Sequence, residues 1–203
     1  MDHSDLIFLC GVPGSKWSGV DTNLRKKFNA DRTDETPERI FFHSEAEPGN
    51  PNNGHRGAYW GPGQGCGEDW DVLEHLGYIN VLHDIYDIFS GEGPKVIKSH
   101  MFARHDNLSW IYKNFTGARI FLVYREPELC YNWWYDTMKL EDGYYPDYRP
   151  MYIDYNIMRK LIHEESANIR NFAYEKGMSW VNYNKHYETR HDDVFLAETT
   201  IGE

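Results

Sequence analysis

The sequence has few cysteines and no long hydrophobic run. Its three cysteines, Cys10, Cys66 and Cys130, form no C-x-x-C pair, and the odd number argues against a zinc ribbon, a redox dithiol or a disulfide framework. The first apolar run, at residues 6–10, is too short for a signal peptide or a membrane span. We therefore expect a soluble, cytoplasmic protein in a reducing compartment, with no membrane partner.

Positive charge is scarce as well. The 21 Lys and Arg residues are outnumbered by 32 Asp and Glu residues, which gives a net charge of −11. Proteins that bind nucleic acid usually present a basic face, so no nucleic-acid partner is expected. An anionic ligand would have to be held by a few placed residues rather than by a broad positive field. Aromatic residues make up 16% of the chain, which argues against disorder.

Apolar runs and helical spacings follow one another in a pattern typical of an α/β protein. Short apolar runs predict strands at residues 6–10, 95–98, 118–124 and 178–183, with a candidate short strand at 39–43. Apolar residues at helical spacing predict helices at about 20–28, 71–89, 106–115, 127–140 and 151–176. Alternating strands and helices imply crossover connections. We predict a three-layer P-loop-type fold with a central parallel sheet of about four to five strands flanked by helices.

The chain length suits a single domain over residues 1–203. A Pro- and Gly-rich loop insertion is expected at about 29–69, and a weakly structured tail at about 190–203. Long loops of this kind often bind ligands, although a plain surface loop fits equally well. Three of its residues are candidates for contact with a substrate, namely His55, Tyr59 and Trp60. Ordinary packing is the alternative for the two aromatic residues.

The first predicted strand leads into a glycine-rich turn, Gly11-Val-Pro-Gly-Ser-Lys-Trp-Ser18, and then a helix. Backbone N–H groups at a helix N-terminus suit a phosphate or sulfate, to which Lys16 adds a cation and Ser15 and Ser18 add hydroxyl donors. The turn is not a Walker A motif, because Lys16 follows Ser15 and Trp17 occupies the Ser/Thr position. An ordinary turn with a chance lysine is the alternative.

The second predicted strand ends in Lys98-Ser-His100. Histidine can accept the proton of a hydroxyl near neutral pH, here beside a lysine that suits an anion. A surface histidine is the alternative. Ligands bind beyond the carboxyl ends of parallel strands, which favours a functional role for His100.

The third predicted strand ends at Arg125, and Asn132 follows in the next predicted helix. An arginine can grip a phosphate with two hydrogen bonds, and Asn132 could donate another. An ion pair of Arg125 with Glu126 or Glu128 is the alternative. We expect the three strand ends to converge on one site.

Taken in order, these segments resemble the PAPS-dependent sulfotransferases, which transfer a sulfuryl group from 3′-phosphoadenylyl sulfate. Residues 12–18 resemble the 5′-phosphosulfate loop, typically P-[KR]-S-G-T-T, and residues 96–100 resemble the K-T-H segment. Residues 121–127, with 132–134, resemble the 3′-phosphate segment, Y-x-x-R-x-P followed by S-Y-Y. The chain departs from the pattern at the first loop and lacks the C-terminal R-K-G-x-x-G clamp, so it resembles a divergent, short member.

The resemblance implies an enzyme that uses PAPS, releases adenosine 3′,5′-bisphosphate and needs no metal. Its acceptor would be the hydroxyl of a small molecule or carbohydrate. His100 would be the general base, and Lys98 or Lys16 would neutralise charge on the leaving phosphate. The resemblance assigns the nucleotide to residues of two segments, namely Gly14, Ser15, Lys16, Trp17 and Ser18 in the first, and Arg125 and Asn132 in the second.

Other interpretations remain open. A P-loop phosphotransferase (kinase) shares the strand–loop–helix start but requires GKS or GKT and an acidic residue for magnesium. A non-catalytic, nucleotide-binding relic of the sulfotransferase fold is compatible with the altered first loop. A metal site at 83–84, 163–165 or 191–193 is disfavoured, because adjacent residues on a helix diverge and no H-x-x-x-H or H-E-x-x-H occurs.

Overall fold

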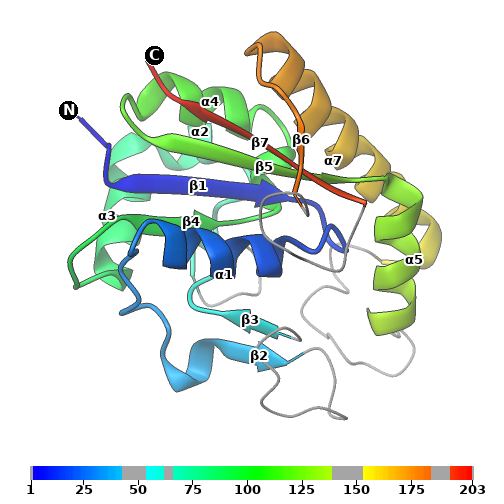
Figure 1. Cartoon of the computed structure of the whole chain (residues 1–203), viewed down its shortest axis with the longest axis horizontal. Coiled ribbons are helices and arrows are strands. Elements are labelled where there is room, and N and C mark those ends of the chain that lie inside the picture. Colours follow the sequence, from blue (N-terminus) through cyan, green and yellow to red (C-terminus); the bar gives the residue numbers. More distant parts are fainter. Residues whose placement is uncertain (1, 43–53, 62–65, 139–152, 184–192, 203) are drawn as a thin grey trace.

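The computed structural model describes residues 2–42, 54–61, 66–138, 153–183 and 193–202. Its centre is a five-stranded sheet in the order β4-β1-β5-β7-β6 (Figure 1). The strands are β1 (Leu6–Gly11), β4 (Lys95–Lys98), β5 (Arg119–Arg125), β6 (Val181–Asn182) and β7 (Val194–Thr200). The α/β class and the strands predicted at 6–10, 95–98 and 118–124 are confirmed.

The sheet is mixed, so the prediction of a parallel sheet is wrong. Strand β1 pairs in parallel with β4 and β5, but β7 pairs antiparallel with β5 along its whole length. Strand β6 then pairs antiparallel with β7. The tail at about 190–203 was expected to be weakly structured, which is wrong for residues 194–200, since they form β7.

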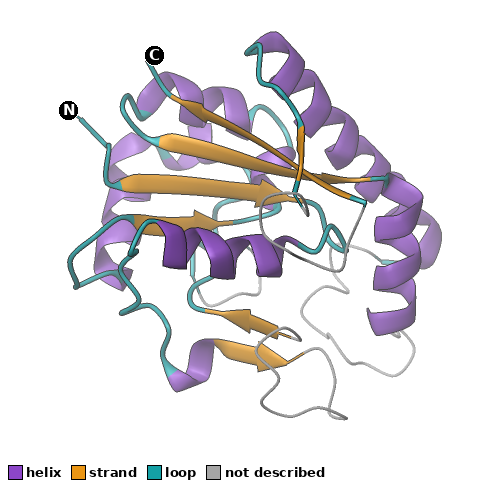
Figure 2. Ribbon diagram, in the orientation of Figure 1, coloured by secondary structure: helices purple, strands orange, loops and turns teal. Residues whose placement is uncertain are grey.

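Helices lie on both faces of this sheet (Figure 2). They are α1 (Trp17–Lys27), α2 (Leu73–Leu76), α3 (Tyr78–Ile88), α4 (Asn107–Asn114), α5 (Pro127–Met138) and α7 (Tyr155–Glu175). The single helix predicted at 71–89 is instead the pair α2 and α3, which meet at Gly77 with φ 83°. None of the helices in these ranges is both long enough and apolar enough to cross a lipid bilayer.

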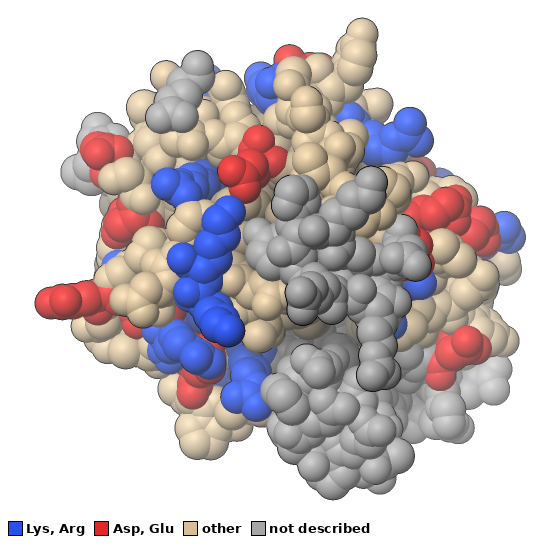
Figure 3. All heavy atoms as spheres, viewed as in Figure 1, with Lys and Arg blue, Asp and Glu red and all other residues tan. Residues whose placement is uncertain are grey.

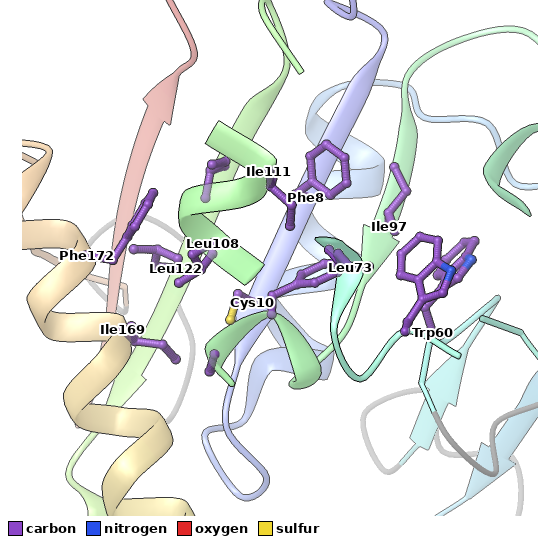
Figure 4. Close-up of a cluster of buried hydrophobic side chains, with 14 of the residues drawn as sticks. Phe8, Cys10, Trp60, Leu73, Ile97, Leu108, Ile111, Leu122, Ile169 and Phe172 are labelled. Carbon is purple, nitrogen blue, oxygen red and sulfur yellow. The ribbon is translucent and has the colours of Figure 1, made fainter. Parts of the chain in front are cut away.

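Alternation along the strands divides the core between the two faces of the sheet. Leu9 and other side chains on one face pack against α1. Phe8 and Cys10 point the other way, into a larger cluster with α4 and α7 (Figure 4). The apolar stripe of α7, which includes Ile169 and Phe172, completes that cluster. A strand buried on both faces reads as a continuous apolar run, as residues 6–10 do.

The segment expected as a loop at about 29–69 contains regular structure where it is described. It holds the short helix η1 (Pro37–Arg39) and an antiparallel pair of strands, β2 (Ile40–Phe42) and β3 (Gly54–Arg56). Residues 58–60 are buried, and the Trp60 amide donates to the carbonyl of Lys98. The end of this segment is therefore attached to the carboxyl end of β4.

Candidate functional site

The carboxyl ends of β1, β4 and β5 lie at one edge of the sheet. Leu9 is in register with Lys98, and Gly11 with Val123, in parallel pairs. Two contacts join the segments that follow these strands. Arg125 Nη1 donates to the Gly14 carbonyl at 3.1 Å. The Tyr59 ring packs against both Trp17 and His100, with centroids 5.2 and 5.5 Å away. The structure thus brings the three predicted segments together.

The first loop, residues 12–16, is tightly fitted against α5. Gly14 has φ 82°, and a Cβ there would lie 2.2 Å from the Cys130 carbonyl oxygen. Lys16, the residue before α1, also has a left-handed backbone, with φ 66°. The Ser15 hydroxyl is buried and has no hydrogen-bond partner among the described residues. A buried hydroxyl without a partner is costly, which is a reason for a ligand at this loop to supply one.

Lys16 carries the cation of this loop. Its Nζ lies 4.1 Å from the centroid of the Trp133 ring. Burial, and next the charge of Arg125, lower the pKa of the Lys16 amine to about 8. The amine is therefore protonated at neutral pH, and a nearby anion would hold that proton more firmly.

Arg125 connects three parts of the site. Its Nε donates to Asp193 Oδ2 at 2.6 Å, while Nη1 donates to the carbonyls of Gly14 and Leu129. The alternative pairing with Glu126 or Glu128 does not occur. Glu126 instead accepts from backbone amides at the start of α5, and Glu128 pairs with a side chain of α7. Asn132 lies exposed on α5.

Lys98 is engaged in a buried ion network. Its Nζ donates to Asp21 Oδ2 at 2.5 Å and to the Arg56 carbonyl. Asp21 also accepts from Arg25 Nε at 2.7 Å, and Arg25 makes two further bonds to Asp34. Only 1% of Lys98 is exposed. In this arrangement the Lys98 amine links β4 to α1.

His100 lies directly after β4 and is 2% exposed. Burial, with the charge of Arg104 as the second cause, lowers the pKa of its imidazole to about 3. The ring is therefore neutral at physiological pH and resists protonation.

The candidate substrate contacts lie in the core or outside the described residues. Trp60 is fully buried and stacks on Trp70 and Phe89, with centroids 5.6 and 5.9 Å away. Tyr59 is also buried, between Trp17 and His100. Packing is therefore the role of both rings in this structure. His55 lies on β3, opposite Phe41, and its side chain is outside the described structure. The tyrosine-rich segment 141–150 also lies outside the described residues.

The remaining assigned residues differ in exposure. Trp17 is part of the core beneath α1, whereas Ser18 is half-buried in the first turn of that helix. Figure 3 shows a band of Lys and Arg across the face on which α1 lies. The exposed lysines of α1 are Lys26 and Lys27, in its last turn. They are at the opposite end of α1 from the first loop, so an anion at that loop depends on Lys16 and Arg125.

Sequence reasoning missed Glu165, a buried carboxylate on α7. Its Oε1 lies 3.4 Å from Arg104 Nε. The available signal was its place at helical spacing between Ile162 and Ile169, which face the core. A charged residue within an apolar stripe is rare unless it is paired or functional.

No protein-family model, no curated protein and no solved structure matches this chain. Within the described ranges, no group of three or more His, Cys, Asp or Glu side chains is placed to hold a metal ion.

Proposed function

We propose that the chain is a PAPS-dependent sulfotransferase with a P-loop-type α/β fold. It transfers a sulfuryl group from 3′-phosphoadenylyl sulfate to the hydroxyl of a small-molecule or carbohydrate acceptor. The observation that carries this proposal is the meeting of three polar strand ends at one edge, through Arg125 and Gly14 on one side and Tyr59 on the other. Their order along the chain is the order of the resemblance.

The nucleotide would be held by two groups of residues. The first loop, with Ser15 and Lys16, would bind the 5′-phosphosulfate. Arg125 and Asn132 would bind the 3′-phosphate. The guanidinium has five N–H donors, so Arg125 can keep its bond to Gly14 while phosphate oxygens replace or join Asp193.

The chemistry needs charge neutralisation and a proton acceptor. As the acceptor oxygen attacks sulfur in line, negative charge builds on the leaving phosphate oxygen. Lys16, half-buried at the first loop, would neutralise it. Charges act more strongly in such a water-poor position than in bulk water. The resemblance assigns the proton of the attacking hydroxyl to His100.

The first test is calorimetric titration with adenosine 3′,5′-bisphosphate. We expect micromolar binding by the wild type, weakened roughly 10- to 100-fold in Lys16→Ala and in Arg125→Ala, because each loses a charge-assisted contact worth about 1.5–3 kcal/mol. Lys113→Ala, which removes an exposed lysine on α4, serves as the control and should bind as the wild type does.

Two results would count against the proposal. Absence of bisphosphate binding by a folded wild-type protein would show that the proposed PAPS site does not exist. Tighter binding of ATP with magnesium, measured in parallel, would favour the phosphotransferase alternative. Thermal unfolding of Arg125→Ala shows whether a loss of bisphosphate affinity comes from displacement of the first loop, since the Arg125 side chain also anchors Gly14.

Bisphosphate affinity should also depend on the protonation of Lys16. The pKa of its amine is about 8, below the usual 10.5, so the cation is present below that pH and is lost above it. We expect the dissociation constant to rise as the pH passes from 7 to 9. Lys16→Arg, which keeps its charge, should show a flatter profile over the same range. Equal pH profiles for the two proteins would show that Lys16 does not contact the anion.

A further inference from the structure

Helix α7 carries a buried carboxylate whose hydrogen bonding is incomplete. Glu165 is 2% exposed, and neither of its oxygens accepts a hydrogen bond from the described residues. The neighbouring Ser166 hydroxyl is equally buried and also lacks a partner among them. Buried polar atoms of this kind are exceptions that call for a structural or chemical reason.

The contacts around Glu165 show which strand ends it lies near. The Asn168 amide, one turn further along α7, donates to the Ala103 carbonyl at 2.9 Å, which holds α7 against the helix η2 (Met101–Ala103). This helix begins directly after His100. Arg104 follows it and places its Nε 3.4 Å from Glu165. Cys10, near the end of β1, packs in the same cluster as Ile162 and Ile169, which flank Glu165 on the buried face of α7. Glu165 therefore lies near both the β1 and the β4 strand ends.

Glu165 and His100 share one cationic neighbour, Arg104, with opposite consequences for a proton. A proton on His100 creates a second positive charge in a buried place beside Arg104. A proton on Glu165 removes a buried negative charge instead. Burial therefore disfavours imidazolium and favours the neutral carboxylic acid. Of the two groups, Glu165 is the better proton acceptor at this edge of the sheet.

We propose that Glu165 is the general base of the transfer reaction, a role that rests on the proposed sulfotransferase function. The acceptor oxygen forms a bond to sulfur, and the bond from sulfur to the phosphate oxygen breaks, with its electron pair going to that oxygen. The hydroxyl proton passes to the Glu165 carboxylate and later leaves to solvent. His100 then serves as a neutral packing partner of Tyr59 rather than as the base.

This role predicts a particular pH dependence. Burial raises the pKa of Glu165 to about 8, and Arg104 opposes that rise only in part. The base form is thus the minority at pH 7, and the rate should increase toward pH 8. Other titratable or charged groups on the elements around α7 include Glu164 beside it, Cys10 on β1, and Glu128 and Cys130 on α5. Strand β5 adds Arg125 and Tyr124, and Tyr124 packs under Arg170 of α7. Glu128 is already paired with Arg159 and His163.

The test compares Glu165→Gln with Glu164→Gln, which changes the exposed neighbour paired with Lys160. The probe is release of bisphosphate from PAPS with a simple aliphatic alcohol or water as acceptor, because such hydroxyls do not ionise between pH 7 and pH 8 and need a base. We expect Glu165→Gln to lower kcat roughly 10²- to 10⁴-fold while bisphosphate affinity stays within about threefold. Glu164→Gln should match the wild type. In His100→Asn the rise in rate toward pH 8 should persist, because Glu165 is the group that titrates there.

The possible failures are distinguishable. If Glu165→Gln turns over as fast as the wild type, or if the rise in rate toward pH 8 disappears in His100→Asn, Glu165 is not the base and the sulfotransferase proposal stands. If the folded wild type neither binds bisphosphate nor releases it from PAPS, the proposed function fails and this role fails with it. Since glutamine is isosteric with the protonated carboxyl, we expect Glu165→Gln to fold.

Discussion

Replacing Asp34 by alanine should lower the free energy of unfolding by about 3–5 kcal/mol, since it breaks a buried ion network. Asp34 is fully buried. Its two oxygens accept from Arg25 at 2.7 and 2.9 Å, and one of them also accepts from the Ala58 amide at 2.8 Å. Without Asp34, the cations Arg25 and Lys98 share the carboxylate of Asp21, and Arg25 has in addition only the more distant Glu35, at 3.8 Å.

The same change should weaken the approach to the site. The bond from Ala58 to Asp34 anchors the chain just before Tyr59, whose ring spans Trp17 and His100. Loss of that anchor is expected to reduce bisphosphate affinity as well as stability. Chemical denaturation measures the first effect and calorimetry the second.

Asp87→Ala provides the matched control. Asp87 pairs with His83 on the exposed surface of α3, where both side chains are more than 60% accessible. An exposed i, i+4 pair of this kind contributes a few tenths of a kcal/mol. If the two aspartate variants lose similar amounts of stability, the buried network around Arg25 contributes no more to stability than an exposed ion pair does. A large loss of unfolding free energy in Asp34→Ala but not in Asp87→Ala supports the stabilising role of the network.

The network also shows where sequence reasoning stops. Asp21 and Arg25 have the i, i+4 spacing of an ordinary surface ion pair, and nothing in the local pattern says that they are buried. The burial of this pair follows from its contacts with Lys98, which is far along the chain, and with Asp34, which lies beyond the end of α1. Lys98 was predicted to be an anion ligand, because the sequence shows its position at a strand end but does not show its ion-pair partner.

The strands were predictable to the extent that each is buried on both faces. Continuous apolar runs identified β1 and β5 correctly, because helices cover the two faces of these strands. Strand β4 was identified from only two apolar residues between lysines, and all four of its residues are buried. Strand β7 lacks such a run, since Glu198 interrupts it and its end is only half-buried. Its pairing with β5 comes from tertiary contact. The crossover rule, which describes β–α–β units, could not foresee an antiparallel return.

The site was predictable in its layout and less so in its chemistry. Parallel strands bring their carboxyl ends together, and the three segments do meet. The aromatic residue Trp60, set among glycines, suggested a binding loop, whereas it packs in the core between Trp70 and Phe89. Glu165 was hidden for the opposite reason, since a carboxylate within an apolar helix face has meaning only once Arg104 is placed beside it.

Gly14→Ala should both destabilise the protein and weaken bisphosphate binding. The added Cβ would lie 2.2 Å from the Cys130 carbonyl oxygen and 2.9 Å from the Cys130 Cα, at a backbone φ of 82° that alanine rarely adopts. Because the atoms it meets belong to the α5 backbone, the first loop would have to move away. We expect a loss of roughly 1–3 kcal/mol of unfolding free energy and at least a tenfold loss of affinity.

Gly19→Ala is the matched control, since it adds the same methyl group to the same region. Gly19 lies within α1, and a Cβ there meets no atom within 4 Å. In a helix, alanine is favoured over glycine by about 1 kcal/mol, so this variant should be slightly more stable than the wild type. It should also bind bisphosphate normally. If Gly14→Ala bound bisphosphate as well as Gly19→Ala does, the anion would not depend on the fit of the first loop against α5. The bond from Arg125 to the Gly14 carbonyl would then have no part in holding the nucleotide.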